Sequence, residues 1–395
     1  MHGLQQVLGW SSEQTPTLSD LHPSLANLDH VRRKIDDLRR KKYPCGTGFD
    51  GALLLQHEQE SMAEPYVRCV EIHPLTGKKE FHLVICMSPS MAFRLLTTFR
   101  LSIDTSFKRL HGWEEFEIEA WDNDHMRSHV VARAFTTSQC ADAHFILFQR
   151  IFEIAMADTG IPVAFKHIDG YGYESVIADA HRGQALGLGT YCTYLCWDID
   201  KHDQYEPQRR LSSLGPYDHL KRFFRICETH FQRNAFAIKH YVGDRVWDAM
   251  MSLYTSDPHP DIQKTFEIIP AGGNKAKAWL KDKLDADQFA LAAIYRPASF
   301  IPEDIWKASP STTNGNEQSH RNINRDGINL TLLGGIMRGK EYDDRAAASI
   351  ELHAAYSINR RDQCSTHARR ASRSIAWHGK MPYDLSQGEA DLSNT

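Results

Sequence analysis

Two runs of alternating apolar and polar residues predict a β-hairpin in the early part of the chain. Tyr66 to Ile72 and Glu80 to Met87 repeat with a period of two, and Leu75 to Lys78 between them has turn character. Ahead of the hairpin, Pro23 to Lys42 has helical spacing and stops before Tyr43-Pro-Cys-Gly46. We therefore expect a small α+β region at the N-terminal end.

Strand-like and helix-like segments alternate through the middle of the chain. Apolar residues at helical spacing mark Ala141 to Ala157 and Gln184 to Tyr194. Strand-like patterns cover Arg100 to Asp104, Glu114 to Trp121, Ser128 to Thr136, Pro162 to Ile168 and Glu174 to Asp179. An RNase H-like core has this element order: three antiparallel strands, then a helix, then a strand that ends in a carboxylate. The pattern predicts an α/β fold in which an RNase H-like mixed sheet is flanked by helices.

The later part of the chain reads mostly as helix. Leu220 to Asn234 begins as a strand-like segment, and residues 235–300 are helical in pattern. Pro302 to Pro310 interrupts this region, and Ser311 to His320 opens another helix. Tyr342 to Trp377 is helical and then basic, ahead of a polar end.

Composition narrows the class of protein. The chain has 395 residues, 42% of them hydrophobic and 24% charged, which is typical of a soluble protein of more than one domain. It contains no apolar run long enough for a membrane span and no secretory signal pattern at Met1. Eight cysteines without framework spacing favour a reducing compartment, so we expect a nuclear or cytoplasmic protein.

The charge distribution changes this picture locally. The net charge of −4 argues mildly against a protein that grips duplex DNA. Val31 to Lys42, however, holds seven Lys or Arg against two Asp, and Gln208 to Arg225 is also basic. Each segment fits either a solvated helix face or a phosphate-binding surface.

Three carboxylates lie at the edges of predicted elements, in the order Asp104, Asp179 and Glu317. Carboxylates fixed on rigid elements are the ligands that Mg²⁺ prefers. Each also has a plain structural interpretation. Asp104 can be a turn residue, Asp179 can cap the following helix, and Asn314-x-x-Glu317 fits a capping box. Asp169 is a rival for the middle position, although Gly170 after it favours a turn.

Four motifs in this order give the chain a resemblance to a known family. They are Ile103 to Lys108 (Ile-Asp-Thr-Ser-Phe-Lys), Ile177 to Gly189, Cys227 to Asn234, and Trp306 with Thr312 to His320. The chain resembles the cut-and-paste DDE transposases of the Mutator-like (MULE) superfamily, in the form common among transposon-derived proteins of fungal genomes.

The resemblance implies an RNase H-like catalytic domain interrupted by an α-helical insertion, because a long gap separates Asp179 from Glu317. It also implies that Asp104, Asp179 and Glu317 are catalytic and hold two Mg²⁺ or Mn²⁺ ions for phosphoryl transfer at DNA ends. The expected divisions are an N-terminal region (1–95), the first part of the core (96–230), the insertion (231–305), the completion of the core (306–345) and a basic helical tail (346–395).

Further residues are candidates for binding. Cys227 and His230 have the spacing of zinc ligands, and Cys192 with Cys196 could complete a set of four; packed thiols and a hydrogen-bonded histidine are the alternative. Basic residues near the carboxylates are candidates for phosphate contacts, with plain surface charge as the alternative. They are Lys108, Arg109, Arg182, His320 and Arg321.

The resemblance favours a metal-dependent transposase that binds double-stranded transposon ends, as a homo-oligomer when active. No zinc-finger spacing precedes Asp104, so we expect a copy without a base-reading module, truncated or domesticated. This feature and the acidic balance favour a second interpretation, a catalytically inactive transposon-derived DNA-binding or scaffold protein. A third, a general nuclease on RNA–DNA hybrids, leaves the long insertion unexplained.

Overall fold

The computed structural model describes residues 20 and 22–356, apart from 76, 78, 123–126, 287, 314–318, 320–322 and 325. The chain divides by contacts into two units. The first contains residues 1–122 and 127–340, and the second contains residues 123–126 and 341–395. Within the second unit, the described residues 341–356 are the C-terminal part of one long helix.

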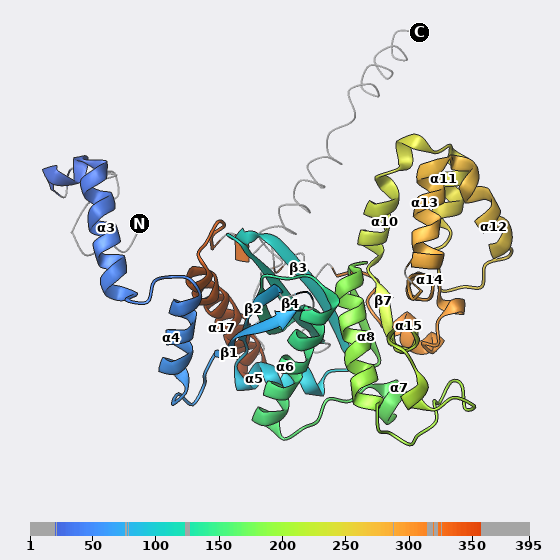
Figure 1. Ribbon diagram of the computed structural model, residues 1–395, viewed down its shortest axis with the longest axis horizontal. Helices are drawn as coiled ribbons and strands as arrows, with labels where there is room; N and C mark the ends of the chain where they lie inside the picture. The colour runs from blue at the N-terminus through green and yellow to red at the C-terminus, as the bar shows by residue number, and fades with distance from the viewer. Residues whose placement is uncertain are drawn as a thin grey trace, which may run out of the picture. The chain divides into compact units, whose positions relative to one another are not determined.

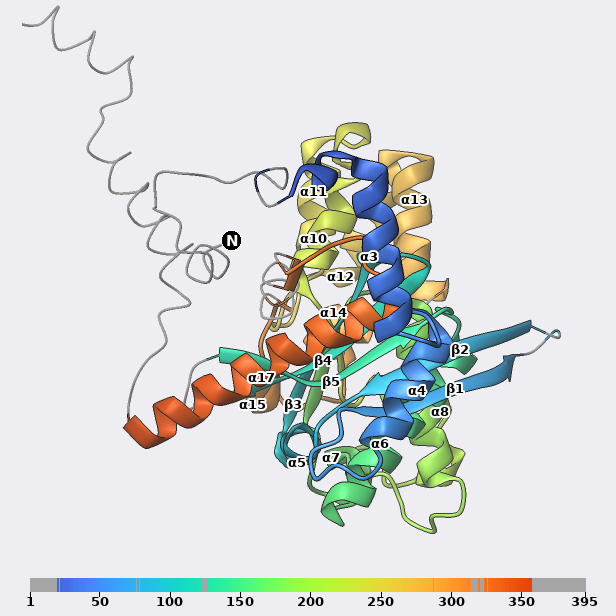
Figure 2. The same ribbon diagram turned by 90° about the vertical axis from the view of Figure 1, so that its left-hand side faces the viewer.

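A mixed sheet of seven strands forms the centre of the first unit, in the order β1-β2-β5-β4-β3-β6-β7. β3 and β6 pair in parallel, as do β6 and β7, and every other neighbouring pair is antiparallel. β1 and β2 are the predicted hairpin and run side by side to their turn (Figure 2). The strands are β1 (Val67–Leu75), β2 (Lys79–Cys86), β3 (Arg100–Leu110), β4 (Trp113–Asp122), β5 (Arg127–Thr136), β6 (Ser175–Ala178) and β7 (Phe224–Ile226).

The helices and 3-10 turns that come before β7 in the chain are η1 (Pro23–Ala26), α3 (Leu28–Lys42), α4 (Phe49–Gln59), α5 (Pro89–Thr97), α6 (Ala141–Thr159), α7 (Lys166–Asp169), α8 (Arg182–Cys196), η2 (Leu211–Ser213) and α9 (Pro216–Leu220). After β7 come α10 (Glu228–Phe236), η3 (Lys239–Tyr241), α11 (Asp244–Met251), α12 (Ile262–Ile268), η4 (Ile269–Gly272), α13 (Asn274–Lys281), the π-turn η5 (Asp282–Ala286), α14 (Ala290–Ile294), η6 (Arg296–Ala298), α15 (Glu303–Ala308) and α17 (Leu332–Tyr356). Figure 1 shows α10 to α13 gathered beside β7.

The two faces of the sheet are covered differently. Phe116 of β4 faces α6, where its ring contacts Phe148 edge-on with centroids 5.6 Å apart. Successive residues of a strand point to opposite faces. Glu115 therefore lies on the other face, where it pairs with the buried guanidinium groups of Arg109 and Arg133. Burying such charges is tolerated because each of them is paired.

The start of α17 covers that charged face. Arg109 donates from Nη2 to the carbonyl oxygen of Gly335 at 2.9 Å, and a Cβ at Gly335 would lie only 2.5 Å from Leu110. The absence of a side chain at Gly335 thus allows helix and sheet to approach closely.

Three sequence predictions need correction. β3 does not end at Asp104 but continues to Leu110, because its pairing with β4 extends beyond the parallel pairing with β6. The predicted strand from Pro162 to Ile168 is wrong: α7 forms there and ends at Gly170 in the left-handed conformation, with φ of 84°. The segment from Leu220 to Asn234 is a strand over three residues only, because α10 begins at Glu228.

The basic helix α3 buries none of its residues, although Asn27 caps its first turn by accepting from the amides of Asp29 and His30. Among the described residues, no helix combines the length and the apolar character needed to cross a membrane.

Candidate metal centre

The parallel pairing of β3, β6 and β7 ends in register, and the next residue along each chain segment can bind a metal. Ile103 of β3 pairs with Ala178 of β6, and Ala178 pairs with Ile226 of β7. The next residues along the three strands are Asp104, Asp179 and Cys227. The amide of Cys227 still donates to the carbonyl oxygen of Ala178 at 2.8 Å, which holds the chain in register beyond the strand. Equal register places all three side chains at one sheet edge.

Asp104 is held rigidly. Its side chain is only 6% exposed, and its Oδ1 accepts from the amide of Thr105 at 2.9 Å. It remains within a strand because β3 is still paired with β4 at this point, where Asp104 is opposite Glu117. The antiparallel pairing of β3 with β4 therefore fixes this carboxylate, and the parallel pairing of β3 with β6 aligns it with Asp179.

His230 reaches the same point from the first turn of α10. Its Nδ1 lies 2.6 Å from Oδ1 of Asp179, and both of these atoms are buried. One ligand atom from each of Asp104, Asp179 and His230 lies within 4.8 Å of the other two. Among the described residues, these three form the group of His, Cys, Asp or Glu side chains whose ligand atoms lie close enough together to hold a metal ion.

The charges in this group depend on one another. Burial and the negative charge of Asp104 raise the pKa of the Asp179 carboxyl, while His230 opposes the shift. Burial lowers the pKa of His230, but hydrogen bonding and charge from Asp179 and Cys227 outweigh this effect and raise the pKa to about 10. The protonated imidazole of His230 thus offsets part of the negative charge of the carboxylates, as a divalent cation bound there would.

The thiol of Cys227 supports His230 and does not form a separate centre. Burial raises the pKa of Cys227, but hydrogen bonds with His230 and Thr313 outweigh it and lower the pKa. Cys192 and Cys196 are buried in α8, and within the described residues they do not join Cys227 and His230 in a four-ligand group. A four-ligand zinc set, one of the two interpretations of the sequence, is therefore not assembled among the described residues.

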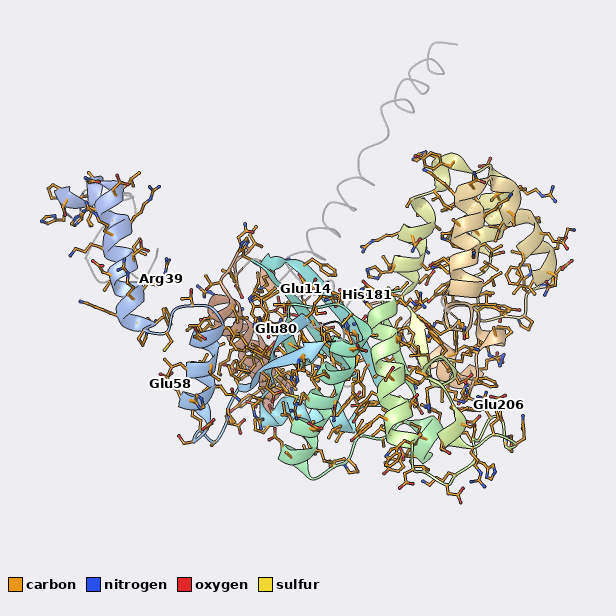
Figure 3. The ribbon with its side chains drawn as sticks, viewed as in Figure 1. Arg39, Glu58, Glu80, Glu114, His181 and Glu206 are labelled. Atoms are coloured by element: carbon orange, nitrogen blue, oxygen red, sulfur yellow. The ribbon has the colours of Figure 1, made fainter. Side chains whose placement is uncertain are left out.

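α8 follows Asp179 closely and packs tightly on α6. His181, seen at the start of α8 in Figure 3, caps it by accepting at Nδ1 from the amide of Gln184 at 3.1 Å. A Cβ at Gly187 would lie 2.5 Å from Cβ of His144, so only glycine allows this approach. The glycines of the Ile177 to Gly189 motif thus place the helix that directly follows the second carboxylate.

Asp169, the rival aspartate, has a different task. Its Oδ2 accepts from the amide of Phe165 at 3.0 Å and so stabilises α7. It is not part of the metal-holding group. The expectation that Asp179, and not Asp169, lies beside Asp104 agrees with this placement.

Of the predicted DNA-contacting residues, the structure describes the side chains of Arg109 and Arg182. Arg109 is fully buried and paired with Glu115, so the expectation that it contacts phosphate is wrong. Arg182 is exposed and donates from Nη2 to the Tyr217 hydroxyl at 3.1 Å. The side chain of Lys108 lies outside the described residues, as do Glu317, His320 and Arg321.

Comparison of the chain with models of protein families, with characterised proteins and with solved structures finds no match.

Proposed function

We propose that this protein is a metal-dependent enzyme of phosphoryl transfer on DNA, of the DDE transposase type found in the Mutator-like superfamily. The observation that supports this most directly is the register of Asp104 and Asp179 on neighbouring parallel strands. Within the sheet, the antiparallel strands β5, β4 and β3 are followed by β6 and β7 in parallel, which supports an RNase H-like core. The helices between β7 and α15 then correspond to the expected insertion.

The chemistry of the donor set fits a divalent cation. Asp104 and Asp179 offer hard oxygen ligands, and their mutual repulsion makes an ion between them favourable. Bound there, a divalent ion would supply Lewis-acid stabilisation of charge on a phosphoryl oxygen. The pairing of β3 with β6 keeps the two carboxylates in register. The burial of Asp104 limits the access of solvent to a cation bound between them.

The chain after the insertion is tethered near this position, which supports Glu317 as the third carboxylate. Thr313 donates from its amide and its hydroxyl to the sulfur of Cys227, in each case over 3.3 Å. Glu317 is four residues further along, within an extended reach of ~14 Å.

We propose that exposed basic side chains contact the DNA phosphates, and we assign no element to the reading of bases. α3 exposes Arg39, Arg40, Lys41 and Lys42 in its last turn and buries nothing, and Arg182 lies three residues after Asp179. Such contacts give affinity without sequence preference. Action on chromosomal DNA would place the protein in the nucleus, as a homo-oligomer that joins two DNA ends.

The test is nicking of supercoiled plasmid by the purified full chain with Mg²⁺ or Mn²⁺. We expect nicking that Asp104→Asn, Asp179→Asn and Glu317→Gln each reduce at least about 100-fold, because loss of a ligand removes transition-state charge stabilisation. Asp169→Asn is the matched control, since that carboxylate caps α7, and should retain nicking. Equal activity in the Asp104 and control variants would refute the assignment.

A second function, binding or scaffolding on DNA without catalysis, is favoured by one observation: the basic helix α3 buries none of its residues. It predicts DNA binding by the wild type with no metal-dependent nicking in the same assay.

A further inference from the structure

We propose that His230 is a direct metal ligand and that its nitrogen makes the centre prefer Mn²⁺ and Zn²⁺ over Mg²⁺ and Ca²⁺. This inference rests on the proposed metal site but goes beyond it, because a site of carboxylates alone would favour the hard cations. From the sequence, the motif that contains His230 fits either a zinc site or a packed thiol with a hydrogen-bonded histidine.

The geometry assigns the imidazole to the carboxylate pair. Its Nδ1 is 2.6 Å from Oδ1 of Asp179 and shares the 4.8 Å group with an oxygen of Asp104. The side chains of His230 and Asp179 are 20% and 28% exposed, but their facing atoms Nδ1 and Oδ1 are buried, so protein forms most of the surroundings of an ion bound there.

The position of His230 is fixed by packing on both sides. The preceding Cys227 is buried at the end of β7, and its sulfur accepts from Thr313. The following residue, Phe231, is buried against Tyr254 and Trp279, with ring centroids 5.3 and 5.9 Å away. Tyr254 donates in turn to the carbonyl oxygen of Ile226 at 3.1 Å. A ligand on such a rigid turn needs little rearrangement to bind.

The chemistry of the ligands decides the selectivity. Mg²⁺ and Ca²⁺ are bound by oxygen, whereas imidazole nitrogen suits Zn²⁺ and other later divalent ions. Mn²⁺ accepts both kinds of ligand. Two carboxylates and one imidazole therefore form a mixed set, in which the imidazole adds affinity for Mn²⁺ and Zn²⁺ and little for Mg²⁺.

The alternative is that His230 serves only as a partner that holds Asp179 and α10 together. In that case the imidazole leaves when the ion binds, and its removal should strengthen or leave unchanged the binding of every cation. The two roles thus predict opposite effects on Mn²⁺ and Zn²⁺.

The experiment is calorimetric titration of the full chain with MnCl₂, ZnCl₂, MgCl₂ and CaCl₂ separately. We expect His230→Ala to weaken Mn²⁺ and Zn²⁺ binding about 10- to 100-fold and Mg²⁺ binding less than about threefold. His230→Asp places an oxygen near the position of Nδ1, so it should reduce the difference in affinity between Mn²⁺ and Mg²⁺. This variant remains informative if His230→Ala folds poorly. His240→Ala, at an exposed histidine of η3, is the matched control and should change nothing.

Pulsed electron paramagnetic resonance of the Mn²⁺-loaded wild type should show coupling to a nitrogen nucleus that is absent from His230→Ala and present in His240→Ala. Unchanged Mn²⁺ and Zn²⁺ affinity in His230→Ala, or no nitrogen coupling in the wild type, would overturn the inference. If Asp104→Asn meanwhile loses all cation binding, the proposed site stands without His230. If Asp104→Asn binds as the wild type does, both the site and this inference are wrong.

Discussion

The sulfur of Cys227 accepts two hydrogen bonds from Thr313, one from its amide and one from its hydroxyl, although the insertion separates the two residues in the chain. This relationship joins the end of β7 to the chain that returns from the insertion. Ser309 is held in the same way, through a hydroxyl contact of 2.7 Å with Ser175 of β6. The returning segment is thus fixed to the two strands that carry Asp179 and Cys227.

Arg225 provides the strongest hold on this segment, and its replacement is our first prediction. Its Nη1 donates to the carbonyl oxygens of Trp306, Ser309 and Pro310 at 3.0 to 3.3 Å, and the guanidinium lies 4.2 Å from the centre of the Trp306 ring. A lysine is shorter and lacks the planar guanidinium that lies over the Trp306 ring, so it cannot reproduce these contacts. Arg225→Lys should lower the free energy of unfolding by about 1–3 kcal/mol in urea denaturation, because buried carbonyl groups lose their donors.

The control for this variant is Arg210→Lys, at an exposed ion pair with Asp200. It should stay within about 0.5 kcal/mol of the wild type. If the two lysine variants were equally stable, the segment would not depend on Arg225.

Our second prediction concerns the contact between α6 and α8. Gly187→Ala would bring a Cβ to 2.5 Å from Cβ of His144, so the helices must separate. Overpacking of this kind costs about 1–3 kcal/mol, and thermal unfolding should detect it. Gly243→Ala is a suitable control, because no heavy atom lies within 4 Å of a Cβ built there. A destabilisation as large at Gly243 would mean that the space around Gly187 is not the cause.

A third prediction addresses the basic helix α3. Replacing Arg39, Arg40, Lys41 and Lys42 with glutamine leaves packing untouched, since α3 buries no residue. Each phosphate contact that is lost should reduce the slope of log affinity against log salt by about 0.9 for duplex DNA. Fluorescence anisotropy at several salt concentrations, with random and terminal-repeat duplexes, measures this slope. An unchanged slope would show that α3 does not touch DNA, and a strong preference for one duplex would reveal base readout.

The sequence identified much of the sheet because the relevant patterns are local. The alternation in Tyr66 to Ile72 and Glu80 to Met87 predicts the hairpin formed by β1 and β2, and the strand patterns around Asp104 and Asp179 correspond to β3 and β6. The sequence alone shows that a carboxylate directly follows an apolar run. That Ile103 pairs with Ala178, and so aligns Asp104 with Asp179, is a property of the assembled sheet.

The environments of Arg109 and His230 depend on contacts that the sequence does not show. Lys108 and Arg109 look like a basic surface pair, but Arg109 is paired with Glu115 and covered by Gly335 of α17. The spacing of Cys227-x-x-His230 leaves both a zinc site and a hydrogen-bonded histidine open, and it does not show that the partner of His230 is Asp179, directly after β6. The only available signal was that Cys227 and Asp179 each follow a short apolar run.

The last prediction concerns acid stability and a buried histidine pair that is not part of the candidate metal centre. Nε2 of His167, in α7, lies 3.0 Å from Nδ1 of His219, in α9, and both side chains are buried. Burial, with the charge of Arg222, lowers the pKa of His219 to about 4, and burial with the neighbouring His219 and Arg222 lowers that of His167. The carboxylates of Asp203 and Asp218 act in the opposite direction on His219 but do not outweigh burial.

A histidine whose pKa is lower in the folded state is neutral there while its unfolded form, with a pKa near 6.5, takes up a proton. Above pH 6.5 both states are neutral and stability is unaffected. As the pH falls from 6.5 towards 4, the unfolded state is increasingly favoured, and His219 alone should lower the free energy of unfolding by about 2 kcal/mol at pH 5. Urea unfolding at pH 7.5 and pH 5 measures the loss. His219→Gln should remove this part of the loss, whereas His57→Gln, at an exposed position, should retain it. An equal loss in both glutamine variants would show that the buried pair is not the source of the acid sensitivity.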